Sequence, residues 1–353
     1  MLVVGVVLVA WLARRDTDSA ERGDHPPIAY FFQPANVYPA ILYLSDNRTT
    51  RTLVELSDHL VDYAVSPDGS QIAFSRSNAD GTIDIWLVEV ATGNLRPLTD
   101  CVKARCEAPT WRADGSQIAY QRHDRNPVTD RLEPRVWIVD VQTAQSRLLA
   151  EDVQQHGATP VWDPTGRRIA YYDETVPGIR VLDMASGSEV VIANRNDVVG
   201  AFSPDGSRLV YPVLTRGALR ETFYSQLEIV DFESMAIEYI SSELVEDVFA
   251  AWSPDGTQLL VARRYLDERY TAGTQLYTLE IASGAVEPVI VDPAYHHAAM
   301  SYDATGRWIV FQRFALTESG AEPEIWLHDT ETGETRLIAP NAFFPAFVNP
   351  SPR

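Results

Sequence analysis

The chain has 353 residues, of which 45% are hydrophobic and 22% are charged, a composition typical of a folded globular protein. Its 49 acidic residues outnumber 29 basic ones and give a formal net charge of −20. Because such a surface repels a phosphate backbone, the charge argues against a nucleic-acid partner. It favours a basic protein, a cation or a cationic ligand.

The N-terminal region contains an apolar run, residues 2–13, followed by two arginines. The run is shorter than the roughly 20 residues that a membrane-spanning helix needs, and it suits the apolar core of a signal peptide. We expect residues 1–15 to be a hydrophobic anchor or a signal remnant, and the polar residues 16–27 to be a flexible tether. The arginine pair by itself favours a cytoplasmic location for the rest of the chain.

A four-residue turn motif recurs six times after this region. Its clearest form, Ser-Pro-Asp-Gly, stands at 66–69, 203–206 and 253–256. The motif ends in Gly69, Gly115, Gly166, Gly206, Gly256 and Gly306, which lie 40 to 51 residues apart. Proline and aspartate suit the two central positions of a tight hairpin, and glycine adopts the left-handed conformation that closes it. The spacing indicates an internal structural repeat.

Each turn is preceded by one predicted strand and followed by three. In the first unit the strands after the turn include residues 72–74, 85–88 and Leu98. The strand before each turn ends in a bulky residue, namely Val65, Trp111, Trp162, Phe202, Trp252 or Tyr302. These runs carry strand signals and no helical period. Four strands per unit predict the blades of a β-propeller, an all-β fold.

The two ends of the chain predict how the ring closes. Residues 345–347 repeat the inner-strand pattern of residues 109–111 but have no strands after them. The three missing strands match residues 28–30, 41–46 and 51–54. We therefore expect a C-terminal inner strand to join three N-terminal strands, which removes exposed sheet edges. Residues 28–350 would form one propeller of seven four-stranded blades, with six blades as the alternative.

The chain contains two cysteines, Cys101 and Cys106, separated by four residues. A zinc site would need about four ligands, and no matching cysteine or histidine pair is nearby. We predict a disulfide that closes a short loop, with two free thiols as the alternative. Because a disulfide requires an oxidising compartment, it favours the extracytoplasmic side of the cell envelope.

A polar position recurs six residues before each bulky end of an inner strand. It is occupied by His59, Arg105, His156, Asn196, Glu246, His296 and Asn341. Equivalent positions of a propeller surround its axis, so we predict a ring at one channel mouth that binds a peptide, a glycan or an ion. The alternative is that these are ordinary polar turn residues.

Two longer inserts with arginines, residues 122–135 and 213–225, are expected to be contact loops.

The histidines of this ring raise the hypothesis of a metal site, since neutral imidazole is a common ligand. However, His59, His156 and His296 belong to the first, third and sixth units, which spreads them around the ring. His297 follows His296, but adjacent strand residues point to opposite faces. We therefore assign no metal and no cofactor.

The Ser-Pro-Asp-Gly turn, a strand like Ile72-Ala73-Phe74 and a strand that begins like Ile85-Trp86 resemble the WD-like repeat of TolB-like propellers. The resemblance covers nearly the whole chain after residue 27 and implies a propeller fold without a particular activity. TolB itself has an α/β domain before a six-bladed propeller, whereas about two dozen residues precede the first strand here.

Other families carry similar repeats. Prolyl oligopeptidases and dipeptidyl peptidases combine them with a hydrolase domain, whose Gly-x-Ser-x-Gly motif is missing from this sequence. Oligogalacturonate lyases are similar-looking propellers with a histidine-lined metal site.

From these observations we predict a protein that is not an enzyme, namely a TolB-like propeller that acts as a scaffold for a protein or glycan partner. We expect a monomer in the cell envelope, on the extracytoplasmic side, with membrane association through its N-terminus. The alternative function is a metal-assisted polysaccharide lyase or hydrolase that uses the histidines of the ring.

Overall fold

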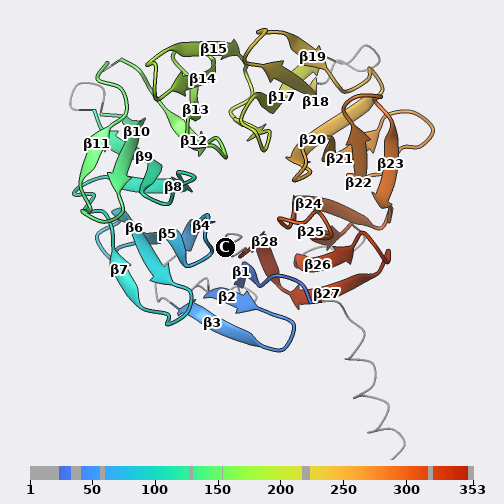
Figure 1. Ribbon diagram of the computed structural model, residues 1–353, viewed down its shortest axis with the longest axis horizontal. Coiled ribbons are helices and arrows are strands. Elements are labelled where there is room, and N and C mark those ends of the chain that lie inside the picture. The colour runs from blue at the N-terminus through green and yellow to red at the C-terminus, as the bar shows by residue number, and fades with distance from the viewer. Residues whose placement is uncertain are drawn as a thin grey trace, which may run out of the picture.

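The computed structural model describes residues 24–32, 41–55, 60–126, 130–152, 154–216, 223–316 and 321–348. These residues form 28 β-strands arranged in sheets around a central axis (Figure 1). The all-β propeller fold is therefore confirmed. None of the described residues belongs to a helix long and apolar enough to cross a membrane. The predicted anchor at 1–15 and most of the tether lie outside the described residues.

Four sheets are each built from consecutive antiparallel strands. The first contains β12 (Ala158–Trp162), β13 (Arg168–Asp173), β14 (Gly178–Asp183) and β15 (Glu189–Ala193). The second contains β16 (Ala201–Phe202), β17 (Arg208–Arg216), β18 (Phe223–Asp231) and β19 (Ile237–Tyr239). The third contains β20 (Val245–Trp252), β21 (Gln258–Tyr265), β22 (Gln275–Glu280) and β23 (Val286–Ile290). The fourth contains β24 (Tyr295–Tyr302), β25 (Trp308–Ala315), β26 (Glu324–Asp329) and β27 (Thr335–Pro340).

The fifth four-stranded sheet joins the two ends of the chain. It contains β28 (Ala342–Phe347), β1 (Ile28–Phe32), β2 (Ile41–Ser45) and β3 (Thr50–Glu55), in that order. Ile28 is paired with Phe347, and Ala29 with Ala346. The first and last parts of the chain lie side by side in Figure 1, in blue and red. The predicted closure by a C-terminal inner strand and three N-terminal strands is confirmed.

The remaining eight strands form one continuous sheet. They are β4 (Leu60–Val65), β5 (Gln71–Ser77), β6 (Ile83–Glu89), β7 (Leu95–Pro97), β8 (Arg105–Trp111), β9 (Gln117–Arg125), β10 (Leu132–Asp140) and β11 (Ser146–Leu148). A parallel contact between Ile83 of β6 and Arg105 of β8 joins the two halves, and the Ile83 N–H donates to the Ala104 carbonyl (3.3 Å).

This sheet corrects the predicted blade count. Neither seven nor six separate four-stranded blades are present, because five four-stranded sheets accompany one eight-stranded sheet. The physical reason is the conformation of the connection between β7 and β8, which holds the start of β8 against the start of β6. A repeat pattern that assigns four strands to every unit does not reveal this contact.

The recurring sequence features have direct structural roles. In the turn at 203–206, Asp205 Oδ1 accepts hydrogen bonds from Ser203 Oγ (2.6 Å) and Ser207 N (3.0 Å), and Gly206 has φ 70°. The bulky ends of the inner strands pack between sheets. The Trp252 indole, for example, donates to the Ala201 carbonyl of the preceding inner strand (3.0 Å). Turns and packing residues together set the orientation of each inner strand.

Several inner strands contain a bulge with a left-handed residue, including Ala108 (φ 54°), Thr159 (φ 48°) and Phe344 (φ 51°). Side chains from the preceding group of strands accept hydrogen bonds from the backbone N–H groups that these bulges leave unpaired in the sheet. Ala108 N donates to Asp62 Oδ2 (2.7 Å), Thr159 N to Gln121 Oε1 (2.9 Å) and Phe344 N to Gln312 Oε1 (3.0 Å). Each of these bulges is thus held by a polar side chain of the preceding group of strands, from the inner strand β4 or from the second strands β9 and β25.

Candidate functional site

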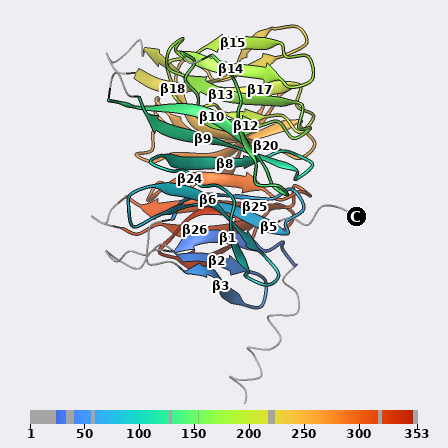
Figure 2. The same ribbon diagram turned by 90° about the vertical axis from the view of Figure 1, so that its left-hand side faces the viewer.

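The predicted ring residues lie where the chain enters the inner strands, at the end opposite to the Ser-Pro-Asp-Gly turns. We call these two sides of the propeller the mouth face and the turn face, and Figure 2 shows the strands running between them. Arg105 begins β8, and Glu246 and His296 are the second residues of β20 and β24. His156, Asn196 and Asn341 precede β12, β16 and β28, whereas His59 lies outside the described residues.

His156 is held between two carboxylates. Its Nδ1 lies 2.8 Å from Glu174 Oε1 and its Nε2 lies 3.7 Å from Glu133 Oε2. Glu174 follows β13, and Glu133 belongs to β10 in the preceding sheet, so the histidine connects neighbouring sheets at the mouth face. With both nitrogens facing carboxylates, the ring of His156 has a fixed orientation.

Arg105 belongs to a polar group on β8 and β9. Its guanidinium is 2.6 Å from Glu107 Oε1, while the Nε2 atoms of Gln121 and His123 lie 3.4 and 4.0 Å from Glu107 Oε2. Burial lowers the pKa of His123, which keeps its imidazole neutral near pH 7. Arg105 is about half-exposed, so it is the member of this group that a ligand can reach.

Glu246 and His296 form a second polar group on the other side of the ring. Arg264 Nη2 donates to Glu246 Oε2, and the guanidinium lies 5.8 Å from the ring centre of Tyr270. His296 Nδ1 lies 3.2 Å from Thr274 Oγ1. Burial, followed by the charge of Arg264, lowers the pKa of His296. This group therefore offers an ion pair beside a neutral imidazole.

Asp62 is a polar residue of the channel wall that sequence reasoning did not single out. Its carboxylate accepts hydrogen bonds from Ser75 Oγ and from Ala108 N in β8. Burial raises the pKa of this carboxyl to about 6, and Glu107 contributes in the same direction. The only available signal was an acidic residue in an otherwise apolar inner strand.

The hypothesis of a metal site requires that the predicted histidines lie close to one another. His156 and His296 each contact residues of their own neighbourhood, and His297 is fully buried with its pKa lowered to about 4 by burial. Within the described residues, no three histidine, cysteine, aspartate or glutamate side chains lie close enough to share a metal ion. The histidines therefore give no support to the metal-assisted lyase.

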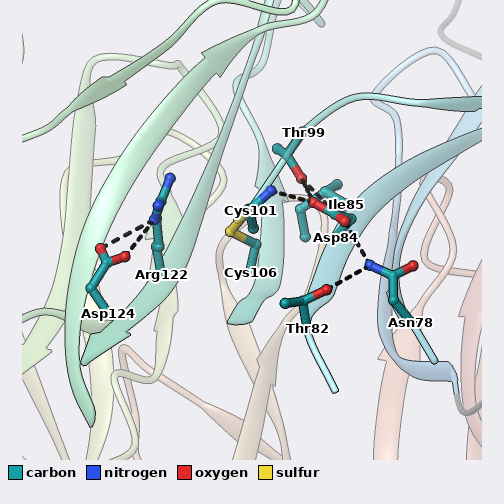
Figure 3. The surroundings of a disulfide bond; sticks show 9 residues. All are labelled: Asn78, Thr82, Asp84, Ile85, Thr99, Cys101, Cys106, Arg122 and Asp124. Carbon is teal, nitrogen blue, oxygen red and sulfur yellow. Dashed lines mark hydrogen bonds and ion pairs between the residues drawn. A yellow bond between two sulfur atoms is a disulfide. The ribbon is translucent and has the colours of Figure 1, made fainter. Parts of the chain in front are cut away.

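The two cysteines form a disulfide next to the ring (Figure 3). Both are buried, and their Cα atoms are 6.3 Å apart. Asp84 holds the same loop, because its carboxylate accepts hydrogen bonds from Cys101 N (2.7 Å), Thr99 Oγ1 (3.1 Å) and Asn78 Nδ2 (2.7 Å). Since Cys106 directly follows Arg105, the bridge also fixes the backbone that carries this ring residue.

Among curated proteins, the chain is similar to the uncharacterized peptidase YuxL of Bacillus subtilis, with 27% identity over 209 residues. The match covers 57% of this chain but only 29% of the relative.

Among solved structures, a prolyl endopeptidase is similar over 97% of this chain and 56% of its own, with a TM-score of 0.66 and 13% identity. Oligogalacturonate lyase from Vibrio parahaemolyticus is similar over 91% of this chain and 87% of its own, with a TM-score of 0.63 and 14% identity. At these identities the likeness shows the fold alone.

These comparisons correct one prediction and establish the family. The prediction that the protein is not an enzyme is contradicted, because the curated relative is a peptidase, of which this chain matches 29% of the length. The family model described as TolB beta propeller domain matches residues 125–347, more than half of the sequence. The chain therefore belongs to the TolB β-propeller family.

Proposed function

We propose that this TolB-like propeller binds a protein ligand at its mouth face, through the polar ring that includes Arg105, His156, Glu246 and His296. The observation that carries the proposal is that these four side chains lie at equivalent ends of inner strands and are each held by a partner. Side chains that are already ordered lose little entropy when they contact a ligand.

The charges of the ring support a peptide as the ligand. Arg105 can contact a carboxylate or a carbonyl group, whereas Glu246 can accept hydrogen bonds from backbone N–H groups. Both signs of charge therefore occur on one face, as an extended peptide backbone with mixed side chains requires. The similarity to a peptidase and to a prolyl endopeptidase is consistent with this ligand class.

The location that we propose is the extracytoplasmic side of the cell envelope. The buried Cys101–Cys106 disulfide supports it, because such bonds persist in oxidising compartments. In this proposal residues 1–15 attach the chain to the membrane, residues 16–27 form the tether and residues 28–350 form a monomeric propeller.

Site-specific photo-crosslinking in intact cells tests the binding face. A photoreactive amino acid replaces Leu214, an exposed residue of β17 near the mouth face, or Met235, an exposed residue of the turn face. We expect a discrete protein adduct from position 214 and none from position 235. The charge reversal Glu246→Arg should abolish the adduct, whereas Glu233→Arg on the turn face should leave it unchanged. Equal adducts from both positions, or an adduct that persists in Glu246→Arg, would contradict the proposal.

A further inference from the structure

Neighbouring sheets also meet at the turn face, and arginines connect them at three consecutive seams. In each case the guanidinium donates a hydrogen bond to the carbonyl of the next turn glycine. The pairs are Arg112 Nε with Gly166 O (3.2 Å), Arg168 Nη1 with Gly206 O (2.7 Å) and Arg208 Nη2 with Gly256 O (3.1 Å). The seams therefore share a recurring guanidinium position.

Each of these arginines also lies over an aromatic ring of the following sheet or of its turn. The distances from the guanidinium carbon to the ring centre are 5.9 Å for Arg112 and Trp162, 5.0 Å for Arg168 and Phe232, and 4.8 Å for Arg208 and Trp252. A carbonyl acceptor and an aromatic face together form a suitable site for a planar cation.

The next seam, between the sheet β20–β23 and the sheet β24–β27, has a different residue at this position. Arg168 and Arg208 stand two residues after their turn glycines, and the corresponding residue after Gly256 is Gln258. A groove of about 860 Å³ lies at this seam and is lined by Gln258, Asp255 and Tyr302, among others. Gln71 also follows a turn glycine by two residues, but its seam lies within the continuous eight-stranded sheet.

The groove keeps the acceptor and the aromatic ring of the other seams. Tyr302, at the end of β24, corresponds to Trp252 at the end of β20, and Gly306 corresponds to Gly256. The Gly306 carbonyl accepts only a long hydrogen bond from Thr330 Oγ1 (3.3 Å), which leaves capacity for a second donor. The groove therefore has the same two recognition elements without an arginine from the preceding sheet.

Asp255 adds a negative charge to the groove. Its Oδ1 accepts hydrogen bonds from Ser253 Oγ (2.6 Å), Thr257 N (3.0 Å) and Thr257 Oγ1 (2.9 Å), and these bonds lower the pKa of the carboxyl. Its Oδ2 accepts none of these three bonds. Burial lowers the pKa of His328, which also lines the groove, so that its imidazole is neutral near pH 7. The titratable groups of the groove thus give it a net negative charge.

We propose that this groove binds the guanidinium group of an arginine side chain that a partner protein supplies. The incoming group would take the position that Arg208 occupies at the preceding seam, over the ring of Tyr302 and near Asp255 and the Gly306 carbonyl. The site lies on the turn face, opposite to the ring of the mouth face, and does not depend on the function proposed for that ring. An overall charge of −20 favours a basic segment as the partner.

Two variants test the site from opposite directions. Gln258→Arg supplies the missing arginine from within the chain and should fill the groove, whereas Arg208→Gln should open an equivalent groove at the preceding seam. Binding of the peptide Gly-Gly-Arg-Gly-Gly is measured by NMR chemical-shift perturbation and isothermal titration calorimetry. We expect one site in the unmodified protein, at least about tenfold weaker binding in Gln258→Arg, and two sites in Arg208→Gln.

Control probes and variants separate the alternatives. The matched peptide with lysine should bind several-fold more weakly, because an ammonium group lacks the planar fork of guanidinium. Asp255→Asn should weaken binding, whereas Asp205→Asn, in a turn with the same internal hydrogen bonds, should not. Equal binding by Gln258→Arg and the unmodified protein would overturn the site. Binding of N-acetyl-arginine amide without binding of the peptide would overturn the protein partner.

Discussion

At the scale of single residues, Asp62 is the carboxylate whose environment changes its chemistry most clearly. Burial raises its pKa to about 6, so the folded protein holds this proton more tightly than the unfolded chain does. The resulting contribution to stability is complete below the ordinary pKa of an aspartate. It is lost as the pH rises through about 6. At pH 8 the folded protein therefore contains a costly, partly buried charge beside Ala108.

The variant Asp62→Asn should remove this cost, because the amide oxygen can still accept the hydrogen bond from Ala108 N. We expect the free energy of unfolding to increase by about 1 to 2 kcal/mol at pH 8, with a much smaller difference at pH 4. Urea denaturation at the two pH values measures both quantities. Glu233→Gln on the exposed turn face serves as the control. A gain in stability that is the same at pH 4 and pH 8 would argue against a buried charge at Asp62.

At the scale of elements, the disulfide loop between β7 and β8 explains the eight-stranded sheet. Cys106 lies in β8, and the loop brings Ala104 and Arg105 against Ile83 of β6. The double variant Cys101→Ser/Cys106→Ser should therefore loosen this junction. We expect a loss of about 2 kcal/mol in stability, the value for closing a short loop. We also expect faster hydrogen exchange at the Ile83 amide.

The control for this effect is the amide of Val88 in the interior of the same strand, whose exchange should follow global unfolding alone. Unchanged exchange at Ile83 in the double variant would mean that strand pairing, rather than the disulfide, holds β8 against β6.

Sequence reasoning located most strands, because each turn has defined chemistry and each following strand carries β-branched or aromatic residues. It could not reveal the contact between Ile83 and Arg105, since this pairing depends on a loop conformation rather than on strand composition. It also treated residues 122–135 and 213–225 largely as loops, whereas β9, β10, β17 and β18 extend into them as long hairpins. Polar residues in these extensions hid the strand pattern.

The candidate ring was likewise only partly predictable from the sequence. Counting back from the bulky residues found positions that lie at one end of the inner strands, but not their partners Glu107, Glu133, Glu174, Arg264 and Thr274. These partners come from other strands and loops, and no spacing in the sequence connects them to the ring. The sequence repeat therefore predicts where a ring residue lies in this fold, whereas its hydrogen-bond and ion-pair partners are seen only in the structure.

At the scale of the whole molecule, the pairing of β28 with β1 is the contact that closes the ring, and it links residues more than 300 positions apart. An engineered disulfide can measure its importance, because Ala29 and Ala346 are direct partners. The matched control is Ala64 and Ala73, direct partners within a single hairpin. Each pair combines a fully buried alanine with a partly buried one, so the cost of replacing alanine by cysteine is similar.

The closure disulfide restricts nearly the whole unfolded chain, whereas the control disulfide closes a loop of about ten residues. In the chain-entropy model the first should stabilise by about 5.7 kcal/mol and the second by about 2.7 kcal/mol. We expect Ala29→Cys/Ala346→Cys to raise Tm clearly more than Ala64→Cys/Ala73→Cys, as measured by calorimetry under oxidising and reducing conditions. If the terminal strands separate before the rest of the ring unfolds, the stabilisation by the closure disulfide exceeds the value from chain entropy, because this bridge also blocks the separation. Equal gains in Tm for the two bridges would contradict this prediction and would mean that closure through β28 does not limit the stability of the ring.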